Sequence, residues 1–116
     1  MVMLKEGLNR IRDLHGADIE KGKMGTDGTA ANESQTGLQT GVAASEQDVT
    51  VSSADKTNTI SYRLDNLTGT SNIYREFGTR NDTDSIDYDR VTFTGIEHTA
   101  NDDIVITKII NYRNPE

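Results

Sequence analysis

The stretch DVTVSSADKTNTISYRL, residues 48–64, contains two short runs in which apolar and polar side chains alternate. The apolar positions of these runs are Val49 and Val51, then Ile60, Tyr62 and Leu64. A period of two, carried by β-branched and aromatic residues, is typical of β-strands with one buried face. Turn-forming residues at 54–58 separate the runs, so we expect two strands here.

The same alternation recurs three times toward the C-terminus, at residues 73–77, 91–93 and 104–112. Turn-forming clusters separate these runs, and a sixth short strand is expected at 17–20. Several short strands at nearly regular spacing predict a mainly β fold, an antiparallel β-sandwich. Residues 105–110 are apolar on both faces, which predicts a central strand or a strand covered on both sides.

Residues 3–14 predict a short amphipathic helix before these strands. Its apolar side chains recur at helical spacing on one face and are Leu4, Leu8, Ile11 and Leu14. Gly16 suits the position just after a helix, where a left-handed conformation is common. We expect this helix to cover one end of the core or to dock on a neighbouring chain.

A polar segment follows the predicted helix. Residues 21–47 are dominated by Gly, Thr, Ser, Ala and Asn and contain few large apolar side chains. A structureless stretch of this length is uncommon in a compact domain unless contacts hold it, so we expect it to drape over a neighbouring subunit. The expected organisation is a single domain over 1–116, with a helix at 1–16, an extended polar arm at 17–47 and a β-sandwich at 48–114.

Composition limits the partners of this chain. Its 116 residues carry a net charge of −7 and include no Cys. An acidic chain without a basic stripe is repelled by nucleic acid and by anionic membranes, so neither is an expected partner. The absence of Cys excludes disulfides and thiolate metal sites. No apolar run approaches the roughly 20 residues that cross a bilayer, and no signal peptide is expected because charge follows Met1–Leu4 directly.

The sequence contains no motif for catalysis or cofactor binding. His15 and His98 lack the spacing of metal ligands, and the Gly-rich stretch at 25–28 lacks a phosphate-binding signature. The aspartates between Asp82 and Asp89 lack the Gly and Glu of a calcium loop, which leaves a solvated acidic hairpin or a weak cation site. We therefore predict no enzyme activity, no cofactor and no metal.

Glu76 and Arg90 are charged residues in or beside two predicted strands, in apolar and aromatic surroundings. If these strands are neighbours, the two side chains meet as an arginine–carboxylate bridge at the edge of the sandwich. Gly78 suits a β-bulge or a positive φ. A structural bridge and a binding role both remain open for this pair.

A series of short motifs resembles a known protein family. Their order along the chain is Leu4…Gly7-Leu8…Ile11…Leu14, Gly25-Thr26-Asp27-Gly28-Thr29-Ala30, Thr36-Gly37-Leu38, Glu76-Phe77-Gly78 and Arg90-Val91-Thr92-Phe93…Ile96…Thr99. In this order and spacing the chain resembles small virion proteins of tailed viruses, of the kind related to the N-terminal module of phage tail-collar fibre proteins. The resemblance extends over nearly the whole sequence.

The resemblance implies a non-catalytic virion structural protein, an oligomeric attachment or adaptor module at the tail, in a fibre, collar or baseplate. The implied partners are copies of the same chain, for example in a trimer, and neighbouring virion proteins. Because the sequence ends at Glu116, we expect no receptor-binding shaft. A capsid decoration or head-fibre protein is one alternative, and a carbohydrate-binding β-sandwich module is another. The expected structural or interface residues are Leu4, Leu8, Ile11, Leu14, Glu76, Gly78, Arg90 and Phe93.

Overall fold

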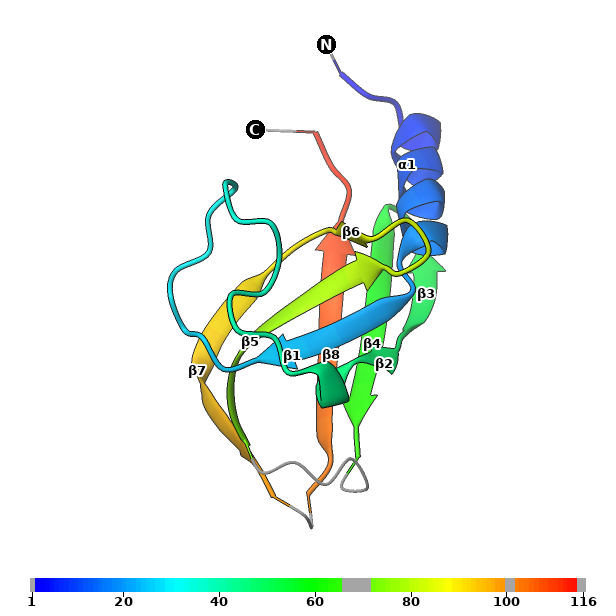
Figure 1. The fold of residues 1–116 in the computed structure, drawn as a ribbon. Coiled ribbons are helices and arrows are strands. Elements are labelled where there is room, and N and C mark those ends of the chain that lie inside the picture. Colours follow the sequence, from blue (N-terminus) through cyan, green and yellow to red (C-terminus); the bar gives the residue numbers. More distant parts are fainter. Residues whose placement is uncertain (1, 66–71, 100–101, 115–116) are drawn as a thin grey trace.

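The computed structural model describes residues 2–65, 72–99 and 102–114. Within these ranges the chain forms one α-helix, one short 3-10 helix and eight strands (Figure 1). In chain order these elements are α1 (Lys5–Asp18), β1 (Lys21–Gly25), η1 (Ala43–Ser45), β2 (Gln47–Asp48), β3 (Thr50–Ala54), β4 (Thr57–Leu64), β5 (Asn72–Asn81), β6 (Ile86–Asp87), β7 (Val91–His98) and β8 (Ile104–Asn111).

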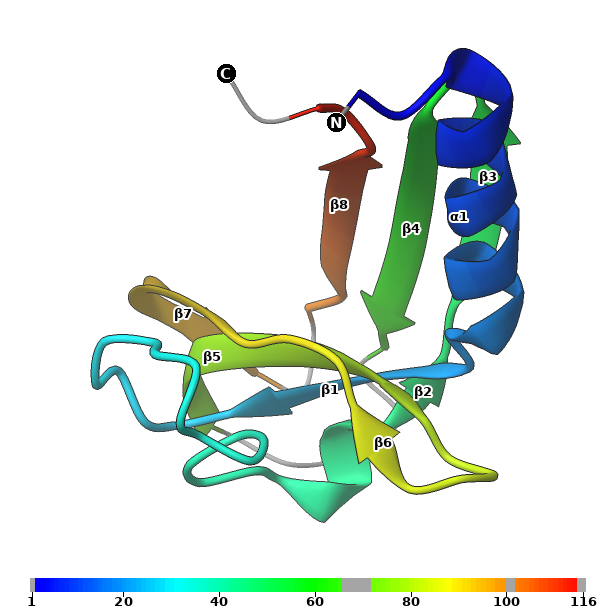
Figure 2. The same ribbon diagram turned by 90° about the horizontal axis from the view of Figure 1, so that it is seen from above.

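The strands form two antiparallel sheets. Sheet A has the order β2-β1-β5, and β6 and β7 pair one after the other along the remaining edge of β5. Sheet B has the order β3-β4-β8. The strands of one sheet run across those of the other (Figure 2). The fold is therefore mainly β and sandwich-like, with one N-terminal helix, as the alternating pattern predicts.

The hydrophobic core lies between the inner faces of the two sheets. Its buried members are Met24, Tyr62, Leu64, Tyr74, Phe77 and Ile104. The rings of Tyr62 and Phe77 meet edge to face, with centroids 5.1 Å apart, a favoured aromatic geometry. The Tyr62 hydroxyl donates to the carbonyl of Ser45 (2.5 Å), so η1 closes one end of the core and satisfies the buried phenol.

Helix α1 packs on the inner face of sheet B, beside sheet A (Figure 2). The Asn58 amide on β4 donates to the carbonyl of Arg12 (2.8 Å). A Cβ on Gly16 would lie only 2.9 Å from the Asn58 amide nitrogen. Gly16 therefore allows close helix–sheet contact inside the helix instead of ending it. The helix continues to Asp18, which corrects both its predicted end and the strand predicted at 17–20.

The segment expected to be an extended polar arm contributes two strands to sheet A. β1 pairs with β5 along five residues on one edge, and the other edge of β1 pairs with β2. Met24 is fully buried in the core, while Gly22 lies where a Cβ would be 2.8 Å from the Tyr62 ring. The arm interpretation is wrong for these residues because backbone pairing and glycine contacts build β1 without the apolar alternation that marks the other strands.

β8 is an edge strand, contrary to the expectation for residues 105–110. It pairs with β4 along eight residues, and no other strand in the described part of the chain pairs with it. Val105 and Ile109, on its outward face, are exposed. The apolar residues on both faces of β8 therefore do not correspond to a central position in sheet B.

Candidate functional site

A buried ion pair joins Glu76 on β5 to Arg90, the residue before β7. The Arg90 Nε donates to Glu76 Oε1 at 2.8 Å, and the Glu76 side chain is fully buried. The Glu76 carboxylate also accepts three backbone N–H groups, from Asp27 (3.0 Å), Gln39 (2.8 Å) and Thr40 (2.9 Å). Burial opposes ionisation of this carboxyl, but the hydrogen bonds from Arg90 and the backbone outweigh it and lower the Glu76 pKa.

The same pair holds the loop of residues 26–41 on the outer face of sheet A. Arg90 donates to the carbonyls of Thr29 (2.7 Å) and Asp27 (3.1 Å) and to the side-chain oxygen of Gln35 (3.0 Å). We call Glu76 and Arg90 together the clasp. The clasp holds the loop against its own sheet, because several of its backbone groups find partners within the chain. Contact of this segment with a neighbouring subunit stays a prediction.

Two glycines allow the chain to pack closely around the clasp. A Cβ on Gly25 would lie 2.4 Å from Glu76 Oε2, and one on Gly78 would lie 2.6 Å from the carbonyl oxygen of Asp89. The register shift in sheet A falls between Tyr74 and Glu76, and Gly78 has no positive φ. The role predicted for Gly78 is therefore corrected: it is required for close backbone approach, not for a bulge or a left-handed conformation.

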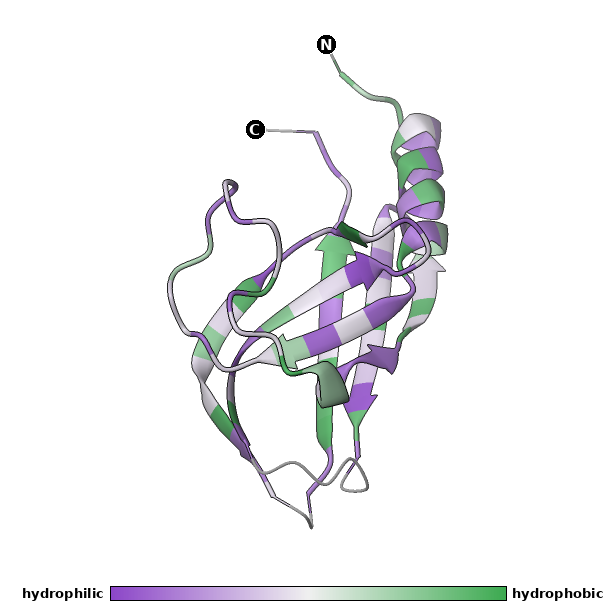
Figure 3. Ribbon diagram, in the orientation of Figure 1, coloured by the Kyte–Doolittle hydropathy of each residue, from purple (hydrophilic) through white to green (hydrophobic). Residues whose placement is uncertain are grey.

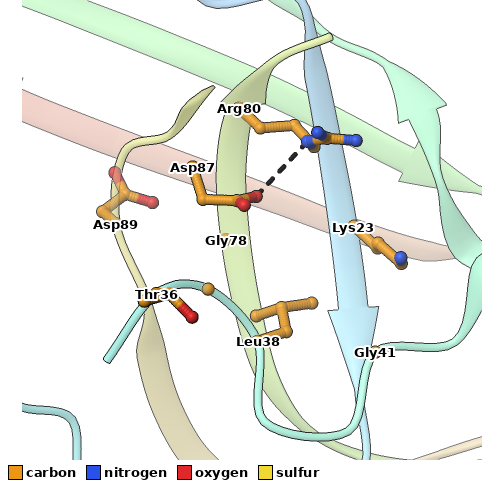
Figure 4. Close-up of a pocket in the computed structure, with 9 residues that line it drawn as sticks. Lys23, Thr36, Leu38, Gly41, Gly78, Arg80, Asp87 and Asp89 are labelled. Carbon is orange, nitrogen blue, oxygen red and sulfur yellow. Dashed lines mark ion pairs between the residues drawn. The ribbon is translucent and has the colours of Figure 1, made fainter. Parts of the chain in front are cut away.

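Beside the clasp, the loop leaves a hollow of about 310 Å³ above sheet A (Figure 4). Its walls include Lys23 and Arg80 from the sheet, Leu38 from the loop, and Asp87 and Asp89. A second hollow of about 490 Å³ adjoins it, shares Asp87 and Asp89, and extends along the loop to residues 31–35. The two hollows together form a polar depression between sheet A and the loop of residues 26–41. We call it the polar depression.

Most carboxylates of this depression are engaged within the chain. Asp87 lies 3.3 Å from the Arg80 Nε, the ion pair drawn in Figure 4. Asp89 accepts from the backbone and hydroxyl of Thr79 (2.9 and 3.0 Å) and from Lys108. Arg80 also pairs with Asp82 (3.1 Å). Three aspartates of the acidic run, Asp82, Asp87 and Asp89, therefore form ion pairs within the chain.

The predicted apolar helix face is divided by the fold. Leu8 is 7 % exposed and packs inward, whereas Leu4, Ile11 and Leu14 are 77 %, 41 % and 58 % exposed. These three, with Gly7 between them, form what we call the helix stripe. The helix shows hydrophobic bands among hydrophilic ones along its length (Figure 3). Adjacent exposed apolar side chains on one element are typical of an interaction surface.

The two histidines lie in different parts of the molecule. His98 is buried at the end of β7, where its Nε2 lies 2.9 Å from the carbonyl oxygen of Asp102. His15 lies on α1 between the rings of Tyr88 and Tyr112. Among residues 2–65, 72–99 and 102–114, no three His, Asp or Glu side chains gather in an arrangement that holds a metal.

The structure brings together Glu76, Arg90 and Gly78 but separates them from the helix residues. Phe93 is half-buried against the core, so it is a packing residue. Sequence reasoning missed the three backbone donors that complete the clasp and the aromatic cluster around His15. Glycines at 25 and 28 were the only local sign of a constrained loop; nothing in the local pattern connected His15 to tyrosines more than seventy residues away.

Comparison with known proteins found no matching family model, no matching curated protein and no matching solved structure. No helix in the described part of the chain has the length and apolar character needed to cross a membrane.

Proposed function

We propose that this protein is a structural assembly module of a virus particle, which associates with copies of itself through the helix stripe and with neighbouring virion proteins. The virion setting and the tail location rest on the resemblance of its motif order to tail-collar modules. The exposed helix stripe supports assembly and is the observation that carries the proposal. Association through the helix stripe would be driven by the hydrophobic effect, because it removes apolar side chains from water.

The helix that carries the stripe is firmly attached to the body of the protein. Asn9 accepts from the backbone of Lys56 (2.7 Å) and Arg12 donates to the carbonyl of Ala54, both at the β3–β4 turn. Met3, just before the helix, exchanges two hydrogen bonds with the Asn114 side chain (2.7 and 3.0 Å). A stripe on a pre-ordered helix loses little conformational freedom when it binds.

The stripe is compatible with a second copy of itself. In an antiparallel helix pair, Leu4 would face Leu14 of the second copy, and Gly7 would face its Ile11. A Cβ on Gly7 would meet only the Met3 methyl, at an ordinary 3.5 Å, so this chain does not itself require glycine there. Glycine inside a helix costs about 1 kcal/mol relative to Ala, and close approach of a second helix would explain its presence.

Sedimentation equilibrium of the purified chain tests the assembly proposal. We expect a concentration-dependent homo-oligomer, and Leu14→Glu should shift the population to monomer. Val105→Glu, at an exposed apolar position on β8, is the matched control and should leave the oligomer intact. A wild-type chain that remains monomeric at millimolar concentration, or an oligomer that only Val105→Glu dissociates, would contradict the proposal.

The virion setting needs a separate test. Purified particles of the virus that encodes this chain should contain it by mass spectrometry, and gold-labelled antibodies should mark the tail. Labelling of the head would favour a capsid decoration or head-fibre protein. Absence from purified particles would reject the virion setting while leaving the self-association result unaffected.

The polar depression favours one alternative, a carbohydrate-binding module. Its larger hollow is lined by polar residues that include Asn32, Gln35 and Asp87, which offer hydrogen-bonding groups for hydroxyl-rich ligands. Titration with a panel of glycans, followed by amide chemical shifts, tests this alternative. Saturable shifts confined to residues 31–37 and 87–90, and abolished by Asp87→Ala, would support it. Absence of shifts at millimolar glycan would reject it.

A further inference from the structure

The His15 side chain on α1 contacts aromatic residues that follow a strand of each sheet. Its ring lies 4.7 Å, between centroids, from the ring of Tyr88, which follows β6 in sheet A. It lies 5.8 Å from the ring of Tyr112, which follows β8 in sheet B. The helix, sheet A and sheet B therefore meet at one imidazole, near the C-terminal end of the helix.

The hydrogen bonds around His15 fit a neutral ring. The amide nitrogen of Asn58 donates to the Tyr112 hydroxyl (3.1 Å) and, at 2.8 Å, to a backbone carbonyl, which fixes it as a donor. The Tyr112 hydroxyl is therefore free to donate its own proton to His15 Nδ1, 2.5 Å away. In this arrangement Nδ1 accepts a hydrogen bond, which a protonated imidazole cannot do.

The second ring nitrogen has no partner to stabilise a cation. His15 Nε2 is buried and finds no hydrogen-bond partner in the described part of the chain. Because Nδ1 accepts a hydrogen bond, the neutral ring carries its hydrogen on Nε2, so Nε2–H lacks an acceptor in both protonation states. Protonation adds a hydrogen to Nδ1, which then points at the hydrogen of the Tyr112 hydroxyl. Protonation therefore takes away the acceptor of the Tyr112 O–H and places a positive charge on a ring whose Nε2–H has no acceptor in the described part of the chain, and both effects cost free energy.

The charged groups around the ring come from every element packed against it. Asp18 on α1 accepts the Tyr88 hydroxyl, Asp89 follows β6, and Lys108 lies on β8. Burial is the largest influence and lowers the His15 pKa; Asp89 and Asp18 oppose this and Lys108 adds to it. Asp89 is already bonded to Lys108, so no free carboxylate outweighs the burial.

We propose that His15 is an acid-sensitive latch: in its neutral form it holds α1 against both sheets, and its protonation releases the C-terminal half of the helix. The docked form is fully stabilised above the ordinary histidine pKa of 6.5 and loses stability as the pH falls below it. The latch stands independently of oligomerisation. If the helix stripe mediates assembly, as proposed above, the latch also makes that assembly dependent on pH.

Hydrogen exchange of the full chain, corrected for intrinsic rates, tests the latch. Between about pH 7.5 and about pH 5, protection of amides at 12–18 should fall several-fold relative to amides of β4. His15→Gln, whose amide bonds to a hydroxyl but does not titrate, should remove this pH dependence. Unchanged wild-type protection, or an equal loss in His15→Gln, would overturn the proposal.

A second measurement does not depend on any variant folding well. An NMR titration of the His15 ring reports its pKa in the wild-type chain directly, and a value at or above 6.5 would reject the latch. Running both measurements in the Leu14→Glu background separates the two proposals. A latch that persists in a monomer supports the intrachain contact, whatever sedimentation shows about assembly.

Discussion

Lys108 on β8 and Asp89, which follows β6, form an ion pair that connects sheet B to sheet A. Both side chains are about three-quarters buried, and Asp89 is further held by two hydrogen bonds from Thr79. Lys108 belongs to β8, so the pair lies at this edge of sheet B. It ties together two sheets whose strands share no ladder.

Lys108→Met should therefore loosen the contact between the sheets. The variant keeps most of the apolar stem but leaves Asp89 with only Thr79 as a partner, so we expect a loss of about 1 kcal/mol in the free energy of unfolding. Urea denaturation followed by circular dichroism measures this loss. Arg63→Met breaks the more exposed Arg63–Asp103 pair and should cost only a few tenths of a kcal/mol. Equal losses would contradict the special role of Lys108.

Glu76→Gln should open the clasped loop. The substitution removes the buried carboxylate that pairs with Arg90 and leaves Arg90 with the partly exposed Asp27 carboxylate, 3.5 Å away. Breaking a buried ion pair typically costs about 3 kcal/mol or more, and the remaining Asp27 contact lowers this expectation to about 2–3 kcal/mol. We expect that loss in urea denaturation, together with faster cleavage by a Glu-specific protease at the exposed Glu33. A variant as stable and as resistant as the wild type would show that the loop is held by other contacts.

The clasp also predicts an acid-dependent stability. The Glu76 pKa in the folded chain lies below its ordinary value of 4.5, so its contribution is complete above about pH 4.5 and is lost as the pH falls through the lower, folded-state value. Between about pH 6 and pH 3, the free energy of unfolding should decline less in Glu76→Gln than in the wild type. Glu33→Gln, at an exposed loop position, should retain the wild-type slope. Parallel slopes for all three proteins would reject this assignment.

Two glycines in α1 should respond oppositely to alanine. Gly7→Ala should raise the free energy of unfolding by up to about 1 kcal/mol, because the added methyl improves helix propensity and meets only a flexible Met3 side chain. Gly16→Ala should lower it by about 1–3 kcal/mol, since the methyl would press against the Asn58 amide. Thermal or urea unfolding of both variants as monomers checks the signs; two stabilising changes would show that Asn58 moves aside freely.

Much of the sandwich was predictable because its strands carry their own signal. The runs around Val51, Ile60, Tyr74, Phe93 and Ile106 coincide with β3, β4, β5, β7 and β8. The bridge between Glu76 and Arg90 was also expected from two charges in apolar surroundings, and the structure contains it. The predicted position at the edge of the sandwich is wrong, because Glu76 lies on β5, which is paired on both sides, and the bridge is buried. In both cases the information is local: a side chain's neighbours in sequence decide which environment it tolerates.

Other features had no local signal. β1 contains only one large apolar residue, Met24, and is a strand because β5 and β2 satisfy its backbone on both edges. The apolar residues on both faces of β8 are typical of a central strand, but β8 lies at an edge of sheet B. Its own residues do not decide this position, because it depends on which distant segments of the chain pair with β4 and β8. The division of the predicted helix face into buried Leu8 and the exposed stripe depends on where Asn58 and the β3–β4 turn meet the helix.

The local pattern of apolar and polar residues thus determines which segments of this protein form helices and which form strands. Periodicity and residue type have this effect because they influence only residues a few positions apart in the sequence. The order of strands, the clasp's backbone donors and the place of His15 between two tyrosines arise only when distant segments compete for the same hydrogen bonds and the same buried volume. That competition is settled by the assembled fold, and it decides which apolar residues remain outside.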